Sequence, residues 1–94
     1  MNNKNIDWFK DNLSKKFDNY ELTYKYLEEG DFGTLNQVEF NSERIDGAID
    51  FWSQGWIGIY AWDNKGEKEL INVLSEPEEK DKAEKAFNDL LEVI

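Results

Sequence analysis

The sequence predicts an α+β fold, in which an antiparallel sheet of four or five strands forms a meander and an N-terminal and a C-terminal helix pack on it. Apolar residues recur every three or four positions at both ends of the 94-residue chain, but alternate with polar residues in the middle. Short segments rich in Gly, Asn, Asp and Ser separate the alternating runs, so consecutive strands should be neighbours. The length suits one domain over residues 1–94.

The first expected element is an amphipathic helix over residues 4–18. Its apolar stripe, spaced by three and four positions, consists of Ile6, Phe9, Leu13 and Phe17. Residues 20–27 then change to a two-residue alternation, which predicts a strand. The apolar side of this strand consists of Tyr20, Leu22, Tyr24 and Tyr26.

Turn-like segments separate the next two expected strands. Residues 28–33 contain two glycines and three acids, a loop composition, and precede a strand over residues 34–41. A polar turn over residues 41–46 leads to a third strand over residues 47–52. The residues expected to face the core are Val38 and Phe40 in the second strand and Ile49 and Phe51 in the third.

The fourth expected strand, residues 56–62, is apolar on both faces, which favours a central place in the sheet. One face consists of Trp56, Gly58, Tyr60 and Trp62, and the other of Ile57, Ile59 and Ala61. A turn over residues 63–66, with Gly66 expected at the positive-φ position, leads to a last strand over residues 69–73.

A capping box predicts where the second helix begins. Ser75 precedes Glu78 by three residues, and Pro77 lies between them in the first turn. The apolar stripe of this helix consists of Ala83, Ala86, Phe87, Leu90, Leu91 and Ile94. If both helices cover the same face of the sheet, the other face keeps part of the Tyr and Trp side chains near water and becomes a candidate binding surface.

The charge of the chain narrows the classes of partner. The net charge is −10, and residues 20–63 alone carry −7. Direct binding to nucleic acid or to an acidic membrane surface is disfavoured, because both need clustered Lys and Arg. A basic protein partner is favoured, because an acidic field speeds the encounter with it. The same acidity is also typical of a protein that simply needs to remain in solution.

The residue types argue against an enzyme. The chain has no His and no Cys, so the common general base and thiol chemistry are missing. Asp31-Phe32-Gly33 occurs without the other kinase motifs, and residues 63–67 lack the closing acid of a calcium loop. We therefore expect no catalytic residues, no cofactor and no metal.

Aromatic residues among acids suggest where a partner would bind. Trp52 and Trp56 flank the turn at residues 53–55, and tryptophan is a frequent interface anchor, although burial in the core is the commoner role. The loop at residues 28–31 is either a solvated turn or a partner contact. The candidate partner-binding residues are Glu28, Glu29, Asp31, Glu39, Glu43, Asp46, Asp50, Trp52 and Trp56.

The run GAIDFWSQGWIGI at residues 47–59 is followed by Asp63, Leu70, Asn72, Val73, Leu74 and Pro77. Through this pattern of turn and core residues, residues 28–94 resemble small immunity proteins of bacterial polymorphic and contact-dependent growth inhibition toxin systems. It implies an inhibitor that binds one cognate toxin domain, often a nuclease, and blocks its active site or an adjacent surface. It assigns no contact residues, because such contacts differ between lineages.

Two further expectations concern location and assembly. The first residues lack the apolar run of a signal peptide and no stretch reaches membrane-spanning length, so we expect a cytoplasmic protein. It should be a monomer or a weak homodimer. The alternative function is an acidic regulatory or adaptor domain, such as an inhibitor that imitates nucleic acid, and this would compete with DNA or RNA for unrelated basic proteins.

Overall fold

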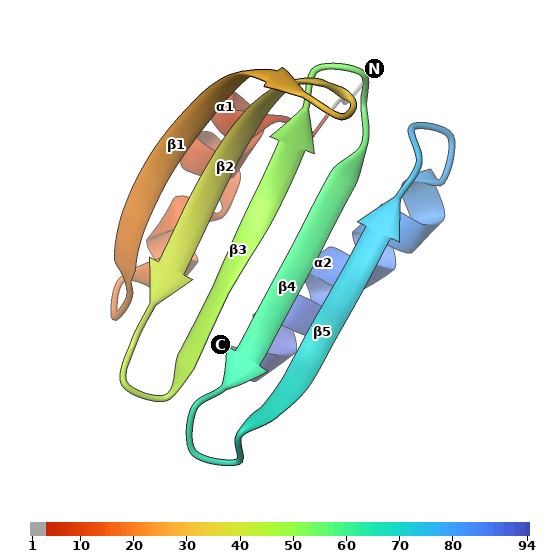
Figure 1. Cartoon of the computed structure of the whole chain (residues 1–94). Helices are drawn as coiled ribbons and strands as arrows, with labels where there is room; N and C mark the ends of the chain where they lie inside the picture. Colours follow the sequence, from red (N-terminus) through yellow and green to blue (C-terminus); the bar gives the residue numbers. More distant parts are fainter. Residues whose placement is uncertain (1–3) are drawn as a thin grey trace.

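Alternating residues in the middle of the chain form one antiparallel sheet, as predicted (Figure 1). The structure is a computed structural model that describes residues 4–94. Its strands are β1 (Glu21–Gly30), β2 (Gly33–Asn41), β3 (Ile45–Trp52), β4 (Ile57–Asp63) and β5 (Lys68–Ser75). Their order in the sheet equals their order in sequence. The helices are α1 (Ile6–Asn12), the 3-10 helix η1 (Ser14–Phe17) and α2 (Lys80–Val93). The predicted α+β meander is therefore confirmed.

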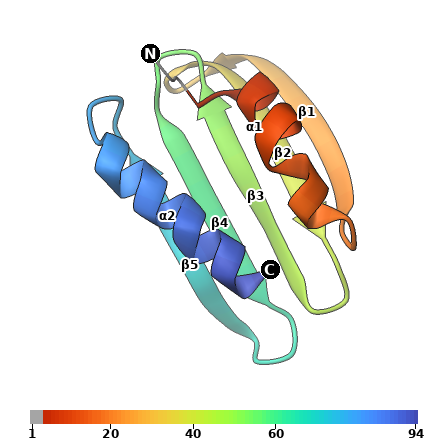
Figure 2. The same ribbon diagram turned by 180° about the vertical axis from the view of Figure 1, so that it is seen from behind.

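Both α-helices cover the same face of the sheet (Figure 2). The two helices meet where the ring of Trp8 packs edge-on against Phe87 at 5.0 Å, and Phe87 also stacks on Phe51 of β3 at 6.2 Å. The core beneath them consists of Phe9, Leu13, Phe17, Val38, Phe40, Ile45, Ile49, Phe51, Ile57, Ile59, Ala61, Ile71, Ala83, Ala86, Phe87 and Leu90. One face of the sheet is thus buried, and no helix within residues 4–94 covers the other.

The N-terminal helical segment is shorter and less regular than the predicted helix over residues 4–18. Asn5 caps α1 by accepting a hydrogen bond from the N–H of Trp8 at 2.9 Å. At the other end, the hydroxyl of Ser14 donates to the carbonyl of Lys10 at 2.7 Å, a local bond that competes with helix continuation. The chain continues as η1, and Phe9, Leu13 and Phe17 still reach the core.

The loop predicted at residues 28–33 is wrong in its length, because β1 continues to Gly30. Glu28 and Glu29 belong to this strand, and the turn is reduced to Asp31 and Phe32 between the paired residues Gly30 and Gly33. Gly33 has φ +95°, a conformation that favours glycine, and a Cβ there would collide with the Oγ of Ser53. Glycine at this position makes the tight turn possible.

The place of β4 in the sheet and the turn that follows it also differ from the sequence-based expectation. The central strand is β3, while β4 is an interior strand between β3 and β5. In the turn after β4, the residue with positive φ is Glu67, at 50°, and not Gly66. The reason is local: the Asp63 carboxylate accepts hydrogen bonds from the N–H groups of Lys65 and Gly66, at 3.0 and 3.1 Å, and so fixes the turn earlier.

The predicted capping box at Ser75 and Glu78 is wrong. Ser75 ends β5, is buried, and lies opposite Ile57 in the sheet, so it is not free to cap a helix. The reciprocal bonds form one residue later: the N–H of Glu76 donates to the Glu79 carboxylate at 2.8 Å, and the N–H of Glu79 donates to the carbonyl of Glu76 at 2.9 Å. The helix α2 then begins at Lys80.

Candidate protein-binding surface

The face of the sheet opposite the helices is called the open face below. Directly paired residues share a face, so the strand registers define its members. On the four strands from β2 to β5, the open face includes Leu35, Gln37, Glu39, Asp46, Ala48, Asp50, Trp52, Gly58, Tyr60, Trp62 and Leu74. Tyr60 and Leu74 keep 38% and 43% of their surface exposed, which is high for side chains of this size. The open face is therefore partly apolar and accessible.

Three of the predicted site carboxylates lie on the open face. Glu39 of β2 is opposite Ala48, whose neighbours along β3 on the same face are Asp46 and Asp50. Glu39 forms an exposed ion pair with Lys25 of β1, with 3.1 Å between Nζ and Oε2, and such pairs contribute little to stability. The strand register thus concentrates negative charge at the centre of this face.

Asp50 is the half-buried member of this group. The Nε2 amide of Gln37 donates a hydrogen bond to its Oδ1 at 2.6 Å. A Cβ built on Gly58 would contact both the Asp50 carboxylate and the Trp52 ring at 3.4 Å, so both side chains lie over that glycine. Burial raises the pKa of Asp50; the bond from Gln37 opposes this, and the negative charge of Glu39 adds to it. Among residues 4–94, the three ion pairs within 4.0 Å leave Asp50 without a cation.

Three aromatic rings form a cluster at the end of the sheet where β3 ends and β4 begins. Phe32 stacks on Trp56, with ring centroids 4.0 Å apart, and meets Trp52 edge-on at 5.2 Å. Trp52 and Trp56 are both half-buried. Neither ring belongs to the core beneath the helices, so the commoner role, burial in that core, does not apply to them. Their role as interface anchors stays a prediction.

Hydrogen bonds between two turns hold this cluster in place. The N–H of Ser53 donates to the carbonyl of Thr34 at 2.8 Å, and the N–H of Gln54 donates to the carbonyl of Phe32 at 3.2 Å. In return, the N–H of Thr34 donates to the Ser53 hydroxyl at 2.9 Å. The β1–β2 turn and the β3–β4 turn therefore form one unit that carries Phe32, Trp52 and Trp56.

The structure divides the nine predicted site residues into three groups. Glu39, Asp46, Asp50 and Trp52 lie on the open face, and Trp56 adjoins it through the aromatic cluster. Glu28, Glu29 and Asp31 are exposed at the β1–β2 hairpin end. Glu43 is exposed in the turn between β2 and β3, at the opposite end of the sheet (Figure 1). The nine residues therefore do not form one continuous site.

Sequence reasoning missed four residues that complete the surface. Tyr60, Trp62 and Leu74 belong to the open face, and Phe32 belongs to the aromatic cluster. The signal for Tyr60 and Trp62 was present, because a strand with two apolar faces cannot turn both toward one core. Phe32 lies in a short turn between two glycines, where an apolar ring needs a partner.

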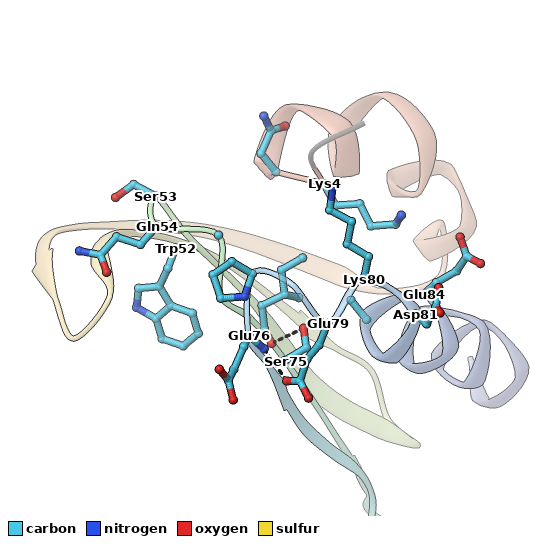
Figure 3. A pocket seen from close by; sticks show the side chains of 15 residues that line it. Lys4, Trp52, Ser53, Gln54, Ser75, Glu76, Glu79, Lys80, Asp81 and Glu84 are labelled. Atoms are coloured by element: carbon cyan, nitrogen blue, oxygen red, sulfur yellow. Dashed lines mark hydrogen bonds between the residues drawn. The ribbon is translucent and has the colours of Figure 1, made fainter. Parts of the chain in front are cut away.

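A groove of about 770 Å³ lies at one end of the molecule (Figure 3). It is lined by the segment before α1, by the β3–β4 turn and by the start of α2, including Lys4, Gln54 and Lys80. The lining also includes Glu79, Asp81 and Glu84, so both signs of charge are present. Of the predicted site residues, Trp52 lines it. Glu76 also lines the groove, so four acids and two lysines are present and the groove is acidic as well, but none of the predicted site carboxylates lies in it.

Comparisons and searches for other kinds of site add no assignment. Comparisons with protein families, curated proteins and solved structures return no match for this chain. Within residues 4–94, no group of three or more Asp, Glu, His or Cys side chains is arranged to hold a metal ion. None of the helices within these residues combines the length and the apolar character that a membrane span requires.

Proposed function

We propose that the protein is a non-catalytic, cytoplasmic immunity protein that neutralises a cognate basic toxin domain, such as a nuclease, by binding it through the open face. The observation that carries the proposal is a sheet face left without a helix, which combines Glu39, Asp46 and Asp50 with exposed or half-exposed aromatic rings. The net charge of −10 supports the same choice of partner. Acidic side chains raise the rate of association with a basic protein, and aromatic anchors supply buried contact area in the complex.

Asp50 supports a basic partner most directly. A half-buried carboxylate that is held by a neutral amide has lost water without gaining a compensating charge. A Lys or Arg of the partner placed beside Trp52 would provide that charge, and the indole face would attract the same cation. Binding would then stabilise an arrangement that is unfavourable in the free protein.

Charge reversal on and off the open face tests the proposal. Glu39→Lys combined with Asp46→Lys should slow association with the product of the adjacent toxin gene and flatten its dependence on salt. The control, Glu84→Lys combined with Glu92→Lys, makes the same change in net charge on exposed positions of α2. It should lower the rate much less, because α2 covers the other side of the sheet (Figure 2). Both variants should retain their fold, since surface substitutions usually change stability by no more than ~0.5 kcal/mol.

The measurements are the association rate at two salt concentrations and the protection of cells that express the toxin. Equal effects of the two double variants would mean that only net charge matters, and that the open face is not the binding site. Competition with DNA or RNA for unrelated basic proteins would instead support a nucleic-acid mimic. Absence of binding to the adjacent gene product would refute the immunity role.

A further inference from the structure

The edge strand β1 is more exposed than its place in the sheet requires. Eight of its ten residues are exposed, whereas β5, the other edge strand, buries Ile71 and Ser75 under α2. Pairing of β1 with β2 is regular from Glu21 to Leu27, and the only register shift lies between Leu27 and Gly30. Among residues 4–94, no other strand pairs with the outer side of β1, which therefore presents a continuous run of backbone N–H and C=O groups.

Apolar side chains gather on the same strand. Five large apolar side chains are exposed among residues 4–94, and three of them are Tyr24, Tyr26 and Leu27 of β1. Tyr26 is the most exposed of the five, at 63%. Proline, bulges or inward-pointing charges usually protect such an edge from pairing with another strand. The regular part of β1 has no proline or bulge, and its single lysine, Lys25, lies on the open face, paired with Glu39.

The charge of β1 indicates which occupant fits. The regularly paired residues 21–27 carry one acid, Glu21, and one base, Lys25, so this part of the edge is neutral in a chain whose net charge is −10, while Glu28 and Glu29 lie beyond it at the end of β1. A basic partner would gain little here compared with the open face. A second copy of the chain would meet little local repulsion, since residues 21–27 of both copies have no net charge.

We propose that two copies of this chain associate through β1, antiparallel and centred on Tyr24, so that the two sheets continue into each other. This register overlays the whole regular segment on itself. It places Tyr24 opposite its own copy, Leu22 opposite Tyr26 and Thr23 opposite Lys25, and it opposes no like charges. The inference is independent of the proposed function.

Tyr24 is already ordered for this contact. Its ring packs edge-on against Phe9 at 6.4 Å, and the Nζ of Lys10 lies 4.9 Å from the ring centroid. A side chain held by the helix side of its own copy loses less conformational freedom on association. The paired edges are short, so the dimer should be weak and dependent on concentration.

Salt separates this association from toxin binding. Each copy carries −10, so long-range repulsion opposes the dimer and added salt screens it. Dimerisation should therefore strengthen as salt increases, whereas binding to a basic toxin should weaken. Loss of one of these behaviours leaves the other intact, so the two proposals fail independently.

Sedimentation equilibrium of the full chain, up to near-millimolar concentration, tests the dimer. The wild type should show a monomer–dimer equilibrium, and Tyr26→Lys should raise the dimer Kd about tenfold or more, since it places a charge against Leu22 of the second copy. Tyr60→Lys makes the same change on the open face and should leave the Kd unchanged. A wild type that remains monomeric at every salt concentration, or equal effects of both variants, would overturn the proposal.

Single cysteines test the register, because the chain has none of its own. Tyr24→Cys places the thiol opposite its own copy and should give a disulfide-linked dimer under mild oxidation. Leu27→Cys lies opposite Glu21 of the second copy, far from its equivalent, and should cross-link much more slowly. Circular dichroism checks that both variants are folded. Equal cross-linking rates would overturn the register and the β1 interface together.

Discussion

The rings of Phe32 and Trp56 stack with their centroids 4.0 Å apart and an interplanar angle of 8°. Phe32 belongs to the turn between β1 and β2, and Trp56 directly precedes β4. The stack therefore connects two hairpins that are separated along the chain by β2 and β3. It fixes one end of the open face, where Trp52 completes the cluster.

Removing the Phe32 ring should loosen this end of the sheet. Phe32→Ala is expected to lower the free energy of unfolding by ~0.5–1.5 kcal/mol beyond the loss of buried area, because both aromatic contacts disappear. Phe32→Tyr keeps the ring and serves as the control. Urea unfolding followed by tryptophan fluorescence measures both variants. Equal stabilities would show that the stack contributes nothing to the fold.

Gly33 should tolerate no side chain. Its φ of +95° is strained for any other residue, and a Cβ there would collide with the Ser53 hydroxyl that accepts the N–H of Thr34. Gly33→Ala is expected to cost about 1–3 kcal/mol. Gly58→Ala is the matched control, since a Cβ at that strand position meets its nearest atoms at 3.4 Å. Thermal unfolding compares the two, and a smaller loss in Gly33→Ala would contradict the expected turn geometry.

Asp50 should make stability depend on pH. Its pKa is raised in the folded state above the ordinary value of 3.8. The folded protein therefore holds this proton more tightly, and the stabilisation is present below pH 3.8 and lost as the pH rises through the folded pKa. Asp50→Asn removes the charge but keeps an oxygen that accepts from Gln37. Its stability relative to the wild type should be greatest at neutral pH and should fall on acidification.

Urea unfolding over a series of pH values measures this difference. The sign would be wrong if Asp50→Asn gained stability relative to the wild type on acidification. A constant difference at every pH would show that the charge of Asp50 is not responsible. The same variant should bind the toxin more weakly, since the proposed cation contact is lost. A more stable but weaker inhibitor would be the expected combination.

The C-terminal half of α2 should be essential for folding. Truncation after Lys85 removes Ala86, Phe87 and Leu90 from the core, and buried side chains of the larger kind contribute ~1.5–3 kcal/mol each. It also uncovers Phe51, on which Phe87 stacks. Thermal unfolding followed by circular dichroism should lose its cooperative transition. Removal of Ile94 alone is the control, and an unchanged transition in the longer truncation would refute the core role of this helix.

Much of the fold could be predicted because a two-residue alternation assigns residues to faces without further information. Val38, Phe40, Ile49 and Phe51 are buried as expected. The errors arose where a side-chain hydrogen bond or strand pairing overrides the linear pattern. Because Asp63 binds the turn backbone, the positive φ occurs at Glu67 and not at Gly66. Because Ser75 pairs with Ile57 in the sheet, α2 begins later than predicted. Such interactions depend on three-dimensional neighbours that a linear pattern does not contain.

The candidate site was harder to predict than the fold. Closeness in sequence grouped Glu43 with Asp46, but the β2–β3 turn separates Glu43 from the open face. Closeness in sequence also favoured Trp52 and Trp56. Both rings contact Phe32, which lies in the β1–β2 turn, far from them in the sequence. Strand register decides which side chains meet, and one sequence does not fix it.

The unbroken strand order β1-β2-β3-β4-β5 has a consequence for how fast the protein folds. Every neighbouring pair of strands is joined by a short turn, so most pairing closes small loops and the relative contact order is low for a sheet. Each strand pairs with the strand that is next to it in sequence, so sheet formation requires no pairing with a distant segment. The chain should fold rapidly for a protein with this much sheet, and a newly made copy would soon present the complete open face.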